Sequence, residues 1–196
     1  MKQTMPIFDA PALLVIDLIE DYFDVDLWPH SQLPQARTRL TEKTNALVAW
    51  CRQENIPIIW VRQAFKPDLS DAFLHVRTRS QRYAIQGTPG AMLLPELNVA
   101  DTDTVITKQR FSAFYQTNLD DVLARLGTRT LILAGITTAW CVRSTAVDAY
   151  QRDLQIVLAR DCIDGFTREE HEASLQAMDG YLGPCYTNAV LFSHSA

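Results

Sequence analysis

The sequence predicts an α/β protein in which helices cover both faces of a parallel β-sheet. Two observations predict this class: short apolar runs recur along the 196 residues, and segments with helical spacing of apolar residues separate them. Strands that are apolar throughout must be buried on both sides, and the intervening helices provide that cover. A chain of this length fits one domain, so we expect residues 1–196 to form a single domain.

The first part of the chain is predicted to contain a strand, a long helix and a second strand. Residues 12–16 form an apolar run that ends at Asp17. Apolar residues then recur at helical spacing from 33 to 54, and residues 56–61 form the next apolar run. This succession is the first unit of the expected parallel sheet.

The segment 63–103 interrupts the pattern. It is about forty residues long and contains several prolines and glycines. A loop of that length in a compact domain usually has a function. We therefore expect it to form a lid over a site or a contact between subunits.

The rest of the chain alternates strands and helices more regularly. A short strand is predicted at 104–107, and Gly127 suits the C-terminal cap of a helix whose apolar face runs from 119 to 126. The remaining predicted elements are, in order, a strand at 130–134, a helix at 141–152, a strand at 155–159, a helix at 168–181 and a strand at 187–192.

The composition is that of a globular protein without a nucleic-acid or membrane partner. Hydrophobic residues make up 47% and charged residues 21% of the chain, and the net charge is -5. This charge gives no electrostatic reason to expect nucleic acid. No segment approaches the ~20 apolar residues that span a bilayer, and residues 1–6 do not resemble a signal peptide. We expect a cytoplasmic protein.

Cys141 is the cysteine whose setting suggests chemistry. The apolar run at 130–134 stops at Gly135, and the thiol follows at the start of a helix-like segment. A helix N-terminus carries partial positive charge and unpaired N–H groups, which can lower a thiol pKa and hold an oxyanion. The four cysteines form no CxxC pair, which argues against a zinc knuckle and against a disulfide framework.

Three reactive side chains follow strands of the predicted sheet. Asp17 closes the first strand, Lys108 closes the third, and Cys141 follows the fourth. Ligands of such sheets bind at the carboxyl ends of the strands, so we expect these side chains to converge. Each has a structural explanation when taken singly: a turn residue, an exposed cation and a small buried hydrophobe.

Together the three residues suit acyl transfer from a small amide. Asp17 could accept the thiol proton and later deliver it to a leaving amine, while Lys108 holds the carboxylate in place and favours the thiolate. The backbone N–H groups of Thr137 and Cys141 are candidates for the oxyanion hole. The product of the first step would be a thioester that water hydrolyses.

Three segments resemble the isochorismatase-like cysteine hydrolases. They are residues 15–23, VIDLIEDYF, residues 108–114, KQRFSAF, and residues 135–142, GITTAWCV. The segments occur in the family's order, and the succession of strands and helices is similar from about residue 10 to 192. The resemblance implies a three-layer α/β/α, Rossmann-like fold with a six-stranded parallel sheet in the order 3-2-1-4-5-6.

The resemblance also implies a site. The family's Asp-Lys-Cys catalytic triad falls on Asp17, Lys108 and Cys141, and its non-proline cis peptide falls between Ile136 and Thr137. Tyr22 is similar to a pocket-lining position in relatives. Ile136 and Trp140, which neighbour the oxyanion and thiol positions, are expected in the same pocket. Family members usually associate, which implies a homo-oligomer, a dimer or tetramer, in which a neighbouring chain sometimes closes the pocket.

Departures from the family narrow the expected substrate. Nicotinamidases in this family carry an Asp-x-His and further histidines after the second strand, where they bind a metal. Residues 61–68, VRQAFKPD, lack that constellation, and Gln63 stands where a number of relatives have histidine. The histidines occur singly and are expected to be surface or structural residues; they are His30, His75, His171 and His194. We therefore predict no metal and no cofactor.

The sequence favours a metal-independent hydrolase that cleaves a C–N bond of a small amide, ureido or carbamoyl compound. One alternative is cleavage of a vinyl ether, as in isochorismatase proper, although members with that activity do not need the cysteine. Another is a redox-sensing homologue in which Cys162 or Cys185 approaches Cys141. Arg79 and Arg82 could clamp a substrate carboxylate, but a solvated loop explains them as well.

Overall fold

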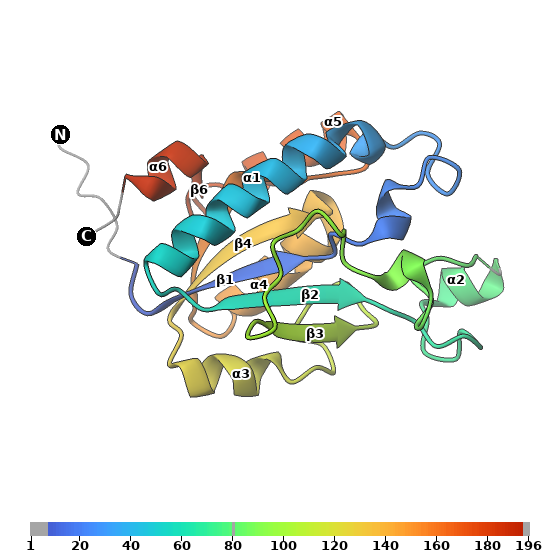
Figure 1. Cartoon of the computed structure of the whole chain (residues 1–196), viewed down its shortest axis with the longest axis horizontal. Helices are drawn as coiled ribbons and strands as arrows, with labels where there is room; N and C mark the ends of the chain where they lie inside the picture. The colour runs from blue at the N-terminus through green and yellow to red at the C-terminus, as the bar shows by residue number, and fades with distance from the viewer. Residues whose placement is uncertain (1–7, 80, 194–196) are drawn as a thin grey trace.

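In a computed structural model that describes residues 8–79 and 81–193, the chain folds into three layers with the sheet in the middle (Figure 1). The sheet has six strands in the order β3-β2-β1-β4-β5-β6, and each neighbouring pair is parallel. The predicted fold class and strand order are confirmed. The strands are β1 (Pro11–Ile16), β2 (Ile58–Gln63), β3 (Thr104–Lys108), β4 (Thr130–Ile136), β5 (Gln155–Asp164) and β6 (Cys185–Tyr186).

Helices cover both faces because successive side chains of each strand point to opposite sides. Leu13 and Val15 of β1 belong to one apolar cluster, and Leu14 and Ile16 belong to another on the opposite face. The first cluster includes α1 and α6, and the second includes α3, α4 and α5. The helical elements are η1 (Glu20–Phe23), α1 (Leu33–Gln53), α2 (Leu74–Thr78), η2 (Pro89–Ala91), α3 (Leu119–Leu126), η3 (Thr138–Val142), α4 (Arg143–Tyr150), α5 (Arg168–Met178) and α6 (Asn188–Phe192).

One predicted strand is wrong. Residues 187–192 were expected to form the sixth strand, but Asn188–Phe192 form α6, and β6 is the shorter segment Cys185–Tyr186. The Thr187 side chain accepts a hydrogen bond from the backbone N–H of Val190 and so caps the helix. A short apolar run can form either element, and the N-cap decides in favour of the helix.

Element boundaries also differ near the carboxyl edge of the sheet. The fourth strand continues to Ile136 and the fifth to Asp164, beyond their predicted ends. The helix expected from Cys141 is preceded by a π-helical turn, η3, that begins at Thr138. Gly127 caps α3 with a φ of 65°, as predicted.

The segment 63–103 packs against the body of the protein. It contains α2 and η2, and its side chains Phe65, Val76 and Tyr83 are buried. In Figure 1 the part of the segment that contains α2 lies beyond the carboxyl ends of β1 and β2, and the last part runs back across the sheet to the start of β3. Its role as a lid or a subunit contact stays a prediction. Among the described residues, no helix combines the length and apolar character needed to cross a bilayer.

Candidate active site

Asp17, Lys108 and Cys141 meet at the carboxyl edge of the sheet. The Lys108 Nζ lies 2.6 Å from Asp17 Oδ2 and 3.3 Å from Cys141 Sγ. The Asp17 and Lys108 side chains are fully buried, and Cys141 is 5% exposed. Strand β2 lies between β1 and β3, so the backbones of β1 and β3 are about 10 Å apart. The lysine side chain is long enough to cross this distance, and β3 can therefore contribute to the cluster.

The backbone around Asp17 directs its side chain into the site. Asp17 has a φ of 57°, in the left-handed region that aspartate adopts more readily than most residues. Its N–H donates to the Val61 carbonyl, and its carbonyl accepts from the Ile19 N–H. The strand therefore ends at Asp17 with its backbone hydrogen bonds satisfied.

A tight approach of β4 to β1 precedes the thiol. Gly135 has a φ of 106°, and a Cβ there would lie 2.0 Å from the Ile16 carbonyl oxygen, so only glycine fits. The Ile136–Thr137 peptide is cis, as predicted. In the following turn, the N–H groups of Trp140 and Val142 donate to the Thr137 carbonyl.

Burial and the two neighbouring charged groups shift the pKa of the Cys141 thiol in different directions. Burial raises the pKa of its thiol to about 12; the Lys108 ammonium opposes this, and the charge and hydrogen bond of Asp17 add to it. Lys108 favours the thiolate, but burial has the larger effect, so the pKa of the thiol lies above its ordinary value. Burial by itself lowers the pKa of Lys108, yet its interactions with Asp17 and Cys141 raise it above its ordinary value.

His171 of α5 contacts the turn that carries the thiol. Its Nδ1 lies 2.7 Å from Thr138 Oγ1 and 4.0 Å from Asp164 Oδ1. Burial lowers the pKa of His171. Asp164 also accepts a 2.6 Å hydrogen bond from Gln32 and pairs with Arg39. This network ties η3 to α1, β5 and α5.

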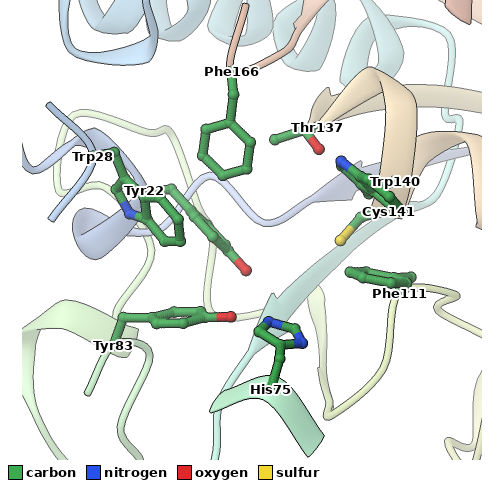
Figure 2. Close-up of a pocket in the computed structure, with 9 residues that line it drawn as sticks. All are labelled: Tyr22, Trp28, His75, Tyr83, Phe111, Thr137, Trp140, Cys141 and Phe166. Carbon is green, nitrogen blue, oxygen red and sulfur yellow. The ribbon is translucent and has the colours of Figure 1, made fainter. Parts of the chain in front are cut away.

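The thiol opens onto a cavity of about 370 Å³. Tyr22 and Trp140, two of the predicted pocket residues, line it. Ile136, the third, does not: its side chain is fully buried in the apolar cluster beneath α1. Figure 2 shows the lining, which consists of Tyr22, Trp28, His75, Tyr83, Phe111, Thr137, Trp140, Cys141 and Phe166.

Sequence reasoning missed most of these aromatic residues. Trp28, Tyr83 and Phe166 come from segments without regular spacing, so no periodic pattern marked them. Phe111 had a signal, because it lies inside the motif that contains Lys108. The Tyr22 hydroxyl donates to Gln63 Oε1, and burial raises the Tyr22 pKa well above its ordinary value.

The other candidate residues lie outside the site. Arg79 and Arg82 are exposed and do not line the cavity, and Arg82 donates to the Pro67 carbonyl. Cys162 packs on the opposite face of the sheet and donates to Asn188. Within residues 8–79 and 81–193, no group of three or more potential metal ligands occurs. His194 lies outside the described residues.

Comparisons with known proteins agree with this architecture. Residues 11–190 match the model of the isochorismatase domain. Over 180 residues the chain is 28% identical to a maleamate amidohydrolase of Pseudomonas putida, covering 90% of this chain and 83% of that protein. Over 203 residues it is 30% identical to a ureidoacrylate amidohydrolase of Methylorubrum extorquens, covering 89% and 78%. The crystal structure of an isochorismatase family protein from Desulfovibrio vulgaris superposes with a TM-score of 0.82 at 29% identity, covering 94% of this chain and 97% of that one.

Proposed function

The chain belongs to the isochorismatase family of hydrolases, and from this premise we propose that it is a cysteine amidohydrolase. Its substrate would be a small amide, ureido or carbamoyl compound, and Cys141 would be the nucleophile. The observation that carries the proposal is the buried contact of Lys108 with both Asp17 and Cys141 at the base of a cavity. The names of two amidohydrolase relatives support the same bond type.

The first half of the proposed reaction forms a thioester. The Cys141 proton passes to Asp17 as Sγ bonds to the amide carbonyl carbon. Lys108 stays charged and stabilises both the carboxylate and the developing thiolate. The carbonyl oxygen becomes an oxyanion held by the backbone N–H groups of Thr137 and Cys141. The C–N bond then breaks, and Asp17 returns its proton to the leaving nitrogen, which departs as ammonia or an amine.

The second half restores the thiol. Water attacks the thioester carbonyl while Asp17 accepts a proton from it, the C–S bond breaks, and the thiolate regains that proton. The sum of the two halves is amide plus water giving carboxylic acid plus ammonia or amine. No step uses a metal or a cofactor. The homo-oligomeric state, as dimer or tetramer, and the cytoplasmic location stay predictions.

Ammonia release from a panel of small amides, ureides and carbamoyl acids tests this function. Cys141→Ala should lower kcat/KM by about 10³-fold or more, because the nucleophile acts as a unit with Asp17 and Lys108. Cys185→Ala is the matched control, since this half-buried cysteine does not line the cavity. Mass spectrometry of the quenched enzyme should show an acyl adduct on Cys141.

Three results would contradict the proposal. Ammonia release that survives in Cys141→Ala would remove the thiol from the mechanism. Turnover of isochorismate without ammonia would favour vinyl-ether cleavage instead. A reversible oxidation of Cys141 that changes assembly, in a protein that hydrolyses none of these compounds, would favour the redox interpretation.

A further inference from the structure

We propose that the cavity selects amides whose acyl group is flat and uncharged, and that it disfavours amides whose acyl group carries a carboxylate. The inference rests on the proposed function, because it takes Cys141 as the point where the carbonyl carbon must lie. It follows from two properties of the lining: the arrangement of its aromatic rings and its lack of a cation.

One wall of the cavity is a continuous aromatic surface. The ring of Trp28 lies 4.8 Å from that of Phe166 and 5.2 Å from that of Tyr83, between centroids, and Tyr22 lies 5.9 Å from Trp28. Rings at these separations touch one another. They therefore form one continuous surface along this side of the cavity.

A second aromatic surface lies on the side of the thiol. The centroids of Phe111 and Trp140 are 5.2 Å apart, and Phe73 supports Phe111 from behind at 4.4 Å. Figure 2 shows Trp140 and Phe111 beside Cys141, across the cavity from Trp28. A planar acyl group in this cavity could stack on one of these surfaces while its carbonyl reaches Cys141. Such stacking adds to the stabilisation that apolar burial provides.

The lining offers a carboxylate no positive partner. Among its described residues there is no lysine or arginine, and His75 at the mouth is the only basic side chain. The nearby cations are engaged elsewhere: Lys108 pairs with Asp17, and Arg110 donates to the Asp71 and Gln109 carbonyls. Taking an ionised carboxylate out of water without a partner is strongly unfavourable, so an anionic acyl group should bind poorly.

The remaining polar groups of the lining are neutral. Burial raises the pKa of both Tyr22 and Tyr83, so their hydroxyls stay protonated. Figure 2 shows both hydroxyls turned toward the middle of the cavity. They can hydrogen-bond to an uncharged ring atom or substituent of the acyl group, but they cannot neutralise a carboxylate.

A matched pair of substrates tests charge selection. Benzamide and 4-carbamoylbenzoate share the ring and the amide and differ by one carboxylate. Their kcat/KM values, from ammonia release at neutral pH, should differ by about 100-fold in favour of benzamide, the discrimination typical of an unpaired buried polar group. Cyclohexanecarboxamide, which is uncharged but not flat, should be poorer than benzamide by about tenfold. Equal or better turnover of 4-carbamoylbenzoate would overturn the proposal, and so would a preference for the non-planar ring.

Placing a cation in the lining provides a second test. His75→Lys adds an ammonium at the exposed mouth, where the fold should tolerate it, and His75→Gln is the uncharged control. The ratio of kcat/KM for 4-carbamoylbenzoate to that for benzamide should rise about tenfold in His75→Lys and stay level in His75→Gln. Tyr181→Ala, at a 76% exposed position that does not line the cavity, should leave the ratio unchanged. An unchanged ratio in His75→Lys would contradict the charge argument.

The failure of this inference can be told apart from failure of the proposed function. Ammonia release that depends on Cys141 but favours carboxylated amides overturns only the inference. If the enzyme turns over none of the panel, binding to Cys141→Ser provides the test: benzamide should quench the tryptophan fluorescence, to which Trp28 and Trp140 of the lining contribute, at lower concentrations than 4-carbamoylbenzoate does. The opposite order, or no quenching by either, overturns the inference without any assumption about turnover.

Discussion

Replacing Lys108 with methionine should destabilise the protein as well as inactivate it. The side chains of Lys108 and Asp17 each have 0% exposure, and their charged atoms are 2.6 Å apart. Methionine keeps the unbranched apolar stem but leaves the Asp17 carboxylate buried without a cation. Removing one partner of a buried ion pair costs about 3–5 kcal/mol. We expect the free energy of unfolding at pH 7 to fall by that amount.

Urea unfolding at pH 7 and one fixed protein concentration, followed by circular dichroism, measures this loss of stability. The double variant Asp17→Asn/Lys108→Met removes both charges and should recover much of the lost stability. Arg129→Met breaks the exposed pair with Asp9 and serves as the matched control; it should cost much less stability than Lys108→Met, because solvent screens an exposed pair. Two results would refute the description of a buried ion pair. One is a free energy of unfolding for Lys108→Met equal to that of the wild type, and the other is a double variant that is no more stable than the single one.

Further predictions concern the thiol and the turn around it. With a thiol pKa of about 12, alkylation of Cys141 by iodoacetamide should be slow at pH 7 and accelerate up to strongly alkaline pH. Asp17→Asn removes a charge and a hydrogen bond that raise this pKa, so alkylation at a given pH should be faster, and a slower rate would contradict the assignment. Gly135→Ala should lower the free energy of unfolding by about 2 kcal/mol or more, because its Cβ would overlap backbone, whereas Gly87→Ala, with open space around it, should cost about 1–2 kcal/mol. His171→Phe removes the hydrogen bond to the thiol-bearing turn and should lower kcat about fivefold to tenfold with KM unchanged; a changed KM with normal kcat would point to a role in binding instead.

The sequence was sufficient for the sheet and for the meeting of Asp17, Lys108 and Cys141. Parallel strands end at a common edge, so residues that close strands near one another in the sheet can meet there, whatever their separation along the chain. Periodicity could not distinguish helix from strand at 187–192, where one capping side chain decides. Nor could it give the thiol pKa, because the degree of burial that raises it depends on packing from distant segments.

Most of the aromatic residues that line the cavity could not be predicted, for a related reason. Trp28, Tyr83 and Phe166 lie in irregular segments that are close only in the folded chain. An aromatic residue in such a segment looks the same in sequence whether it lines a cavity or fills the core. Tyr22 and Phe111 could be identified from the sequence because each lies inside a motif.

The reacting groups and the cavity walls come from different kinds of structure. Asp17 and Cys141 follow the adjacent central strands β1 and β4, whose backbone is held on both sides by neighbouring strands. Tyr83 and Phe166 belong to connecting segments, which open and change more readily than strands. Substitutions in the connecting segments could therefore change which acyl group the enzyme prefers, while the residues that cleave the bond stay in place. In mild denaturant the connecting segments should open before the strands do. The enzyme should therefore lose its discrimination between substrates before the thiol loses its reactivity.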